Sequence, residues 1–169
     1  MTRWETIISE HGPAVWQTAY RLLGNRSDAD ECLQEAFLAA VLIARRGPVR
    51  SWPALLKRLA TSKGIDYLRH RKGGPVQTAD DKVLVTLVSG ELGPDLVAQN
   101  NELASDLRKA LARLPRRQAE VACLRYLSQM DYKEISKELR IDVGNVGVVL
   151  SRARETLRDL LKRRGADHG

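Results

Sequence analysis

The side chains best suited to chemistry in this sequence are the cations, hydroxyls and one tryptophan gathered between residues 45 and 72. Arginine and lysine bind phosphates, hydroxyls hydrogen-bond to base edges, and an aromatic ring or a guanidinium plane accepts an unstacked base. We therefore predict contact with a nucleic acid, including an unpaired strand at the arginine-rich stretch before Trp52, although this tryptophan would suit a hydrophobic core equally well. The predicted contacts are Arg45, Arg46, Arg50, Trp52, Arg58, Thr61, Ser62, Lys63, Arg69, Arg71 and Lys72.

A second group of polar side chains is acidic and lies within an otherwise basic part of the chain. A helix predicted to start near Ser27, in a capping-box pattern, carries apolar residues at three- and four-residue steps along one face. Its other face is either a docking surface or an ordinary solvated face, and its residues are Asp28, Glu31, Gln34, Glu35 and Leu38. Cys32 falls on the apolar face, where we expect a buried and unreactive thiol.

A third pattern, between residues 131 and 161, predicts two helices joined by a three-residue turn. The first starts at a capping box, Asp131 to Glu134, and the second follows Asp142, its predicted N-cap. A short turn before a long basic helix is typical of a helix-turn-helix, in which the start of the second helix meets base edges in the major groove. A plain helical hairpin is the alternative. The base-facing residues would be Val143, Gly144, Asn145, Gly147 and Val148, followed by the basic Arg152, Arg154 and Arg158.

The elements that must position these groups are all predicted to be helices. Apolar residues recur at helical spacing from Trp4 to Leu23, with an interruption expected at Gly12-Pro13 and an end at Gly24-Asn25. Pro53 pre-sets the start of the basic helix, and Pro115 separates two further helices. The predicted fold class is therefore all-α.

The charge of +7 on 169 residues divides into two basic blocks around a mildly acidic stretch. Residues 1–72 carry +5, residues 73–100 carry −3 and residues 101–169 carry +5. The middle stretch is punctuated by glycine and proline and has no sustained helical period, so we predict a linker there. Two basic lobes on one tether favour a polyanion that is contacted at two places, although +7 alone would also suit an ordinary protein surface.

Composition argues against several classes of protein. No apolar run approaches the ~18 residues of a membrane-spanning helix, and the charged first ten residues argue against a secretory signal. Two cysteines 91 positions apart exclude a disulfide scaffold and a cysteine-based zinc site, and three scattered histidines argue against a histidine-built metal centre. A nuclease would need clustered carboxylates or histidines for metal ions, and none is found outside the acidic face. We expect a cytoplasmic, non-enzymatic protein without cofactor, metal or membrane insertion.

Three motifs, in order along the chain, carry a resemblance to a known family. The first is similar to the region 2 segment that binds the clamp helices of core RNA polymerase, and it reads Asp28-Ala29-Asp30-Glu31-Cys32-Leu33-Gln34-Glu35-Ala36-Phe37-Leu38. The second is similar to the segments that open and read the −10 element, and it runs from Trp52-Pro53-Ala54-Leu55-Leu56 to Ile65-Asp66-Tyr67-Leu68-Arg69. The third is like region 4, and it joins Leu111-Ala112-Arg113-Leu114-Pro115-Arg116-Arg117-Gln118 to Tyr132-Lys133-Glu134-Ile135-Ser136 and Leu150-Ser151-Arg152-Ala153-Arg154. The chain thus resembles a bacterial sigma-70-family factor of the extracytoplasmic-function type.

This resemblance implies a transcription initiation factor built from two small helical domains and a flexible linker. Region 2, a helical bundle, would cover residues 1–72, the linker 73–100, and region 4, with its helix-turn-helix, 101–169. The acidic face would bind the clamp helices of core RNA polymerase. The cationic set at residues 45–72 would melt and read the −10 element, with a flipped-out base held in the Arg45–Trp52 loop.

For region 4, the resemblance implies contact with the polymerase flap and with the duplex −35 element. The predicted −35 contacts are Arg116, Arg117, Lys133, Val143, Gly144, Asn145, Gly147, Val148, Arg152 and Arg154. Factors of this type are commonly held inactive by an anti-sigma factor, so such a partner is expected here.

The chain departs from the family pattern at two places. Family members usually carry Asn at the position of Ser62, and the typical recognition-helix run Val-Lys-Ser-Arg-Leu reads Val146-Gly147-Val148-Val149-Leu150 here. Each lost phosphate contact lowers the salt dependence of DNA binding by about one unit of slope. Two other functions therefore stay open: a stand-alone helix-turn-helix regulator of duplex DNA, and a degenerate sigma-like interaction protein.

Overall fold

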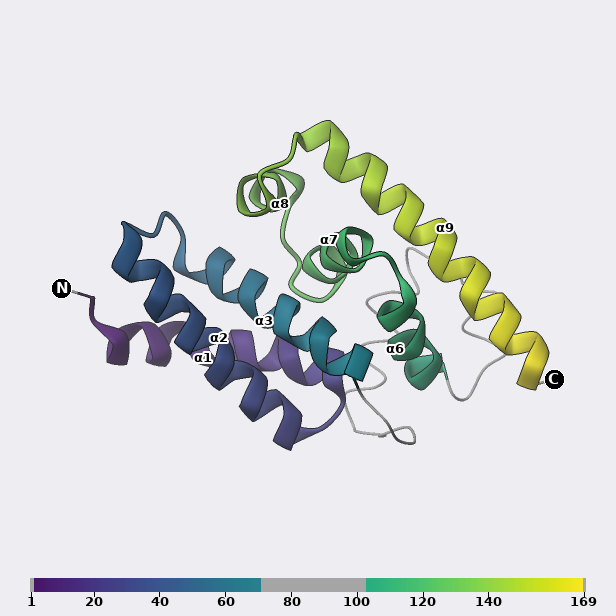
Figure 1. The fold of residues 1–169 in the computed structure, drawn as a ribbon, viewed down its shortest axis with the longest axis horizontal. Helices are drawn as coiled ribbons and strands as arrows, with labels where there is room; N and C mark the ends of the chain where they lie inside the picture. Colours follow the sequence, from purple (N-terminus) through teal and green to yellow (C-terminus); the bar gives the residue numbers. More distant parts are fainter. Residues whose placement is uncertain (1, 71–102, 169) are drawn as a thin grey trace.

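A computed structural model of the chain describes residues 2–70 and 103–168, with side chains up to Arg163. Within these residues every regular element is a helix, which confirms the all-α prediction. The elements are α1 (Trp4–Leu23), α2 (Arg26–Arg46), α3 (Trp52–His70), α6 (Leu103–Arg113), α7 (Arg116–Tyr126), α8 (Tyr132–Leu139) and α9 (Val143–His168). We call α1–α3 the first lobe and α6–α9 the second lobe (Figure 1). The predicted linker, and with it Arg71 and Lys72, lies outside the described residues.

The first lobe is a three-helix bundle whose turns are set by local sequence. Gly24 ends α1 in the left-handed conformation, with φ 81°, and its N–H donates to the Tyr20 carbonyl at 2.8 Å. Asn25 then caps α2, because its side-chain oxygen accepts the backbone N–H of Asp28 at 2.8 Å. The cap predicted at Ser27 was therefore two residues late, since Asn25 and not the serine supplies it.

The expected interruption of α1 at Gly12-Pro13 is wrong. The helix runs unbroken from Trp4 to Leu23 with Pro13 inside it. A proline removes one backbone donor, which leaves the carbonyl four residues earlier, that of Ser9, without its helical partner. Both Ser9 and Pro13 are exposed, so water can satisfy that carbonyl and the break is avoided.

Close packing of α1 against α3 forms the core of the first lobe. Leu22 and Leu56 are fully buried there, together with Ala29, Ala36 and Ala40 of α2. Gly64 lets α3 approach α1, because a Cβ built on it would lie 2.5 Å from Cδ2 of Leu22. Cys32 is buried in the same core, as predicted, and its thiol donates to the Ala60 carbonyl at 3.2 Å.

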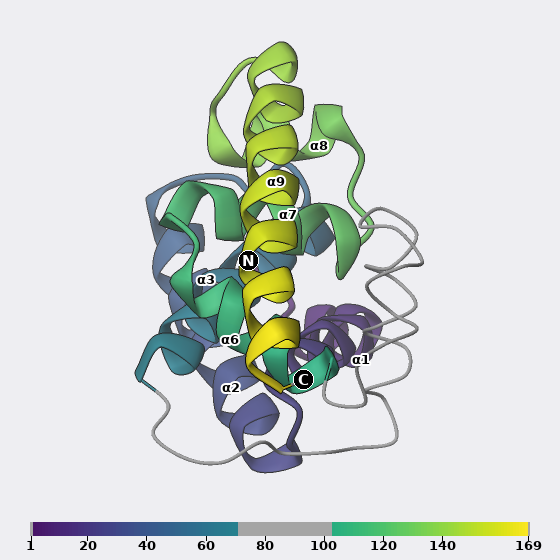
Figure 2. The same ribbon diagram turned by 90° about the vertical axis from the view of Figure 1, so that its right-hand side faces the viewer.

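The second lobe is organised around its long last helix. α9 packs along α6, α7 and α8, and Figure 2 shows it running the length of this lobe. Asp131 caps α8 by accepting the backbone N–H of Glu134 at 2.8 Å, which confirms that start. Arg140 ends α8 in the left-handed conformation, with φ 57°, and α9 begins at Val143 as predicted. The two-helix pattern of a helix-turn-helix is thus present.

The two lobes are packed against each other, which the sequence did not predict. α3 lies between them and contacts α6, α7 and α8 of the second lobe as well as α1 and α2 of the first (Figure 1). In the part of the chain that the structure describes, no helix is long and apolar enough to cross a membrane.

Candidate nucleic-acid interface

The acidic face of α2 is open to solvent. Glu31, Gln34, Glu35 and Leu38 are all exposed, with Leu38 at 67%. Asp28 is only half-buried and sits at the start of the helix, where its side chain accepts a hydrogen bond from Nδ2 of Asn25 at 2.8 Å. The structure therefore brings the five predicted docking residues onto one exposed helix.

An apolar residue that sequence reasoning missed extends this face. Leu42 is 56% exposed and follows Leu38 by one helical turn. Two exposed leucines beside carboxylates form a surface that combines apolar contact with charge. The four-residue spacing from Leu38 is the sequence signal that could have identified it.

Tyr67 of α3 holds the two glutamates of this face in position. Its hydroxyl donates to Oε2 of Glu31 at 2.8 Å and lies 3.3 Å from Oε1 of Glu35. Partial burial and the two carboxylates raise the pKa of Tyr67, so the hydroxyl keeps its proton and stays a donor at neutral pH. Tyr67 falls within the second motif, but its role toward α2 depends on a contact between residues 36 positions apart.

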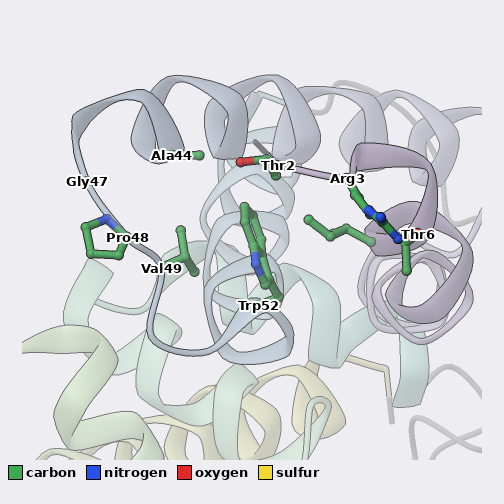
Figure 3. A pocket seen from close by; sticks show the side chains of 9 residues that line it. Thr2, Arg3, Thr6, Ala44, Gly47, Pro48, Val49 and Trp52 are labelled. Carbon is green, nitrogen blue, oxygen red and sulfur yellow. The ribbon is translucent and has the colours of Figure 1, made fainter.

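A cavity lies beside the loop that joins α2 to α3. It has a volume of about 420 Å³, within the ~300–1,000 Å³ of small-molecule sites. Pro48, Val49 and Trp52 line one side, and Thr2, Arg3 and Thr6 from the start of the chain line the other (Figure 3). Trp52 is half-buried and meets the Trp4 ring edge-on, with centroids 5.2 Å apart. The tryptophan thus contributes both to the core and to the cavity wall.

The N-terminal residues of this cavity were not predicted from the sequence. Thr2, Arg3 and Thr6 reach the loop only because α1 crosses the end of α2, and no local spacing signals that crossing. Arg45 and Arg46 are exposed at the end of α2, next to the loop. Arg50 is also exposed, and its Nη2 lies 3.4 Å from the Lys137 carbonyl of α8.

Several predicted DNA contacts on α3 are bonded to the second lobe. Nε of Arg58 donates to Oε1 of Glu138 at 3.0 Å, and Nη2 of Arg69 donates to the Leu114 carbonyl at 2.8 Å. Ser62 accepts a hydrogen bond from Arg116 at 2.7 Å. Lys63 is half-buried.

Thr61 lies in the core rather than on an exposed face of α3. It is 1% exposed, and its hydroxyl has no hydrogen-bond partner among the described residues. In this arrangement it does not lie on the surface that a nucleic acid could contact.

The start of α9 presents a run of exposed residues. Val143, Gly144, Asn145 and Val148 are exposed and Gly147 is half-buried, with 45% exposure for Val143 and 47% for Val148. No charged side chain lies between Val143 and Leu150. The flanking cations Arg117, Lys133 and Arg152 are exposed, whereas Arg116 and Arg154 are half-buried. The start of α9 is therefore bare of charge, and the predicted −35 cations lie on α7, on α8 and further along α9.

A cation–π contact braces the turn that leads from α7 into α8. The Arg125 guanidinium lies 5.5 Å from the centre of the Tyr132 ring, and Nη1 of Arg125 donates to the Met130 carbonyl at 3.1 Å. The backbone N–H of Glu134 holds the pKa of Asp131 below its usual value, which keeps the cap of α8 charged. The helix-turn-helix is thereby fixed at its entry.

Both cysteines are buried, and neither belongs to the candidate interface. Burial raises the pKa of Cys32 and the pKa of Cys123 to about 12 in each case, with neighbouring glutamates adding to the shift. A thiolate is therefore almost absent at neutral pH.

Comparison with known families assigns both lobes. The family model for Sigma-70 region 2 matches residues 7–73, and the model for Sigma-70 region 4 matches residues 104–157. The domain boundaries at 72 and 101 stay a prediction.

Three relatives are similar over most of this chain. The ECF RNA polymerase sigma factor SigW of Bacillus subtilis is 29% identical over 92% of the chain and 87% of the relative. SigM of the same organism is 30% identical over 80% of each. SigE of Mycolicibacterium smegmatis is 26% identical over 99% of the chain, which spans only 65% of that relative's length. The chain therefore belongs to the sigma-70 family, as a sigma factor of the extracytoplasmic-function type.

Proposed function

We propose that the chain binds core RNA polymerase and directs it to promoters, with the first lobe as the docking and strand-opening part. The exposed face of α2 supports the docking step, because it presents carboxylates and leucines to solvent. Tyr67 supports it further by fixing Glu31 and Glu35 before any partner arrives, which lowers the entropy lost on binding. The clamp helices of the polymerase are the proposed partner.

The cavity beside the α2–α3 loop is the proposed site for a base flipped out of the −10 element. It offers an aromatic wall at Trp52, apolar contact at Val49 and polar groups at Thr2, Arg3 and Thr6. Breaking a DNA stacking step costs about 1–2 kcal/mol, and stacking on an aromatic side chain returns about 1–3 kcal/mol per base. Capture of one base can therefore offset the opening of one or two steps. The remaining −10 contacts are proposed to come from the cations of α3 and the loop.

For the second lobe, we propose contact with the −35 duplex through the start of α9. Asn145 can bond an adenine edge, and the exposed Val148 can touch a thymine methyl, which are readouts that need no charge. Arg117, Lys133 and Arg152 would hold the phosphates on either side. The polymerase itself carries out the phosphoryl chemistry, so the chain acts by positioning and is not an enzyme. An anti-sigma factor remains a proposed partner.

The observation that carries this function is the preformed acidic face of α2 within an otherwise basic protein. A stand-alone regulator of duplex DNA has no use for such a face. The test is transcription in vitro with purified core polymerase on a pool of bacterial promoter fragments. We expect transcripts that depend on added protein and start at a restricted set of fragments.

The bare start of α9 favours one second candidate, a sigma-like protein that interacts with partners without reading −35 DNA. Its signature in the same assay would be tight binding of core polymerase with no transcript from any fragment. Binding of duplex DNA without binding of core polymerase would instead identify a stand-alone regulator.

A further inference from the structure

We propose that the unpaired DNA strand continues from the α2–α3 loop onto the start of α1, where Arg3 and Thr6 bind a phosphate next to the flipped base. Neither residue is among the −10 contacts predicted from the sequence, which all lie between residues 45 and 72. The inference rests on the proposed function for the flipped base at Trp52, whereas the phosphate site depends on the walls of the cavity alone.

The cavity beside the α2–α3 loop has two different ends. Gly47 and Pro48 lie at one end, and Arg3 and Thr6 lie side by side at the other, with Trp52 between the two ends (Figure 3). The volume of about 420 Å³ exceeds that of a single base. The cavity therefore has room for a base and for part of the backbone that carries it.

The charge at the two ends suits a strand that enters at one end and leaves at the other. Arg3 is the only charged residue among the described residues that line the cavity. At the other end, Arg45 and Arg46 are exposed in the last turn of α2, directly before Gly47. A nucleotide within a strand has a phosphate on each side of its sugar. Cations at both ends therefore match the two phosphates of a nucleotide whose base stacks on Trp52.

Arg3 and Thr6 carry the groups that bind phosphate. A guanidinium can form two parallel hydrogen bonds to a phosphate, and a hydroxyl adds a further donor. Both side chains are exposed, and neither has a hydrogen bond or ion pair among the residues that the structure describes. A strand can therefore engage them without breaking an existing contact.

The position of Arg3 favours a phosphate contact over readout of a base edge. In Figure 3 its side chain lies apart from Trp52 and beside Thr6. A base that stacks on Trp52 stays at that ring, so the part of the nucleotide that extends toward Arg3 is its sugar and phosphate. Phosphate contacts fix the position of a strand and carry no sequence information. The start of α1 would thus set where the strand leaves the cavity without selecting the base.

Salt dependence tests the phosphate contact, with the full chain and a mixed-sequence single-stranded 12-mer in a fluorescence anisotropy assay. Arg3→Ala should lower the slope of log affinity against log salt by about 0.7, as for one phosphate on a single strand, and weaken binding about five- to tenfold at about 50 mM salt. Arg3→Lys keeps the charge and should keep the slope. Arg26→Ala is the matched control, because Arg26 is exposed at the opposite end of α2 from the loop. Equal slopes in Arg3→Ala and Arg26→Ala, or no binding by the parent chain, would overturn the phosphate site.

Homopolymers separate phosphate binding from base readout. On oligo-dA, oligo-dT and oligo-dC, Arg3→Ala should weaken binding by the same factor, since every nucleotide carries the same phosphate. A loss confined to one base would assign Arg3 to base readout and overturn the proposal. Thr6→Val removes the hydroxyl at nearly constant shape and should weaken binding about two- to tenfold, whereas Thr6→Ser should restore it. Thr6→Val binding as tightly as the parent would remove Thr6 from the site.

A double-mutant cycle tests whether Trp52 and Arg3 hold the same nucleotide. The loss in Arg3→Ala with Trp52→Ala should be smaller than the product of the two single losses, because a base that is not captured leaves its phosphate unplaced. Losses that multiply would place the two side chains on separate nucleotides and overturn the proposal. No polymerase enters these measurements, so a failure of the proposed function shows up only in the transcription assay.

Discussion

The two lobes differ in the types of residue that are predicted to contact DNA. On α3 of the first lobe, the predicted contacts include the cations Arg58, Lys63 and Arg69, and Arg58 and Arg69 have partners in the other lobe. At the start of α9, the predicted contacts are small or apolar, exposed and without charge. Under the proposed function, the first lobe would supply most of the charge-based affinity, whereas the second would supply shape and base contact with charge only outside the start of α9. The predictions below would break or sharpen this division.

The largest effect is expected from reversing charge on the acidic face. Glu31→Lys with Glu35→Lys turns two attractions for a basic partner into repulsions and frees Tyr67, so affinity for core polymerase should fall by about 100-fold or more. Fluorescence anisotropy with labelled protein and purified core measures it. Glu5→Lys with Glu10→Lys, a matched reversal on exposed positions of α1, should change affinity little. If both variants bind core alike, the docking role of α2 fails.

A tryptophan in the cavity wall should matter for strand opening and not for duplex binding. Trp52→Ala removes the stacking surface, and the loss of about 1–3 kcal/mol should lower the open-complex fraction about 5- to 150-fold. Reactivity of unpaired thymines toward permanganate reports the opening. Trp16 offers a matched control, because it is also half-buried but stacks on Tyr20 at 4.8 Å, away from the cavity. Equal opening defects in Trp52→Ala and Trp16→Ala would point to a general loss of stability instead.

Adding a methyl group should lower the free energy of unfolding in the first lobe but not at the start of α9. Gly64→Ala forces a methyl group against the fully buried Leu22 and should cost about 1–3 kcal/mol of unfolding free energy. Gly144→Ala meets no atom within 4 Å and should instead stabilise α9, by up to about 1 kcal/mol. Urea unfolding of both variants measures the difference. A Gly64→Ala midpoint equal to that of the parent would mean that Leu22 can move aside.

The smallest effect is expected from adding a charge to the uncharged start of α9. Gly147→Lys should steepen the dependence of log affinity for duplex DNA on log salt by about one unit, as for one new phosphate contact. There is room for the side chain, since a Cβ at Gly147 would lie 3.6 Å from Cε2 of Tyr132. Gly147→Ala is the control, because it favours the helix without adding charge. An unchanged slope in Gly147→Lys would place this turn of α9 away from DNA.

Local signals in the sequence predicted local structure well. The Asp131 cap, the Gly24 end of α1 and the turn before Val143 each depend on residues within a few positions of one another. The predicted break at Pro13 was wrong because the effect of a proline depends on whether its orphaned carbonyl can reach water. The start of α2 was misplaced because Asn25 and Ser27 are both residue types that can cap a helix, and the structure uses only Asn25.

The candidate site was predicted in part, and what was missed depends on contacts between distant residues. The docking face and the basic α3 followed from residue types at helical spacing. Tyr67 beside Glu31, the N-terminal wall of the cavity and the Arg108 contacts with α1 join residues that only the packing of helices brings together. Burial of Thr61 has the same origin, since hydroxyl residues suit both faces of a helix.

The buried thiols have a consequence for how the protein could be switched on. With a pKa of about 12, Cys32 and Cys123 hold almost no thiolate at neutral pH, and the thiolate is the form that peroxides and disulfides attack. Both sulfurs are also enclosed by packed helices. Oxidation of these two thiols in the folded protein is therefore expected to be slow, so a redox signal would have to act through another residue or a partner protein.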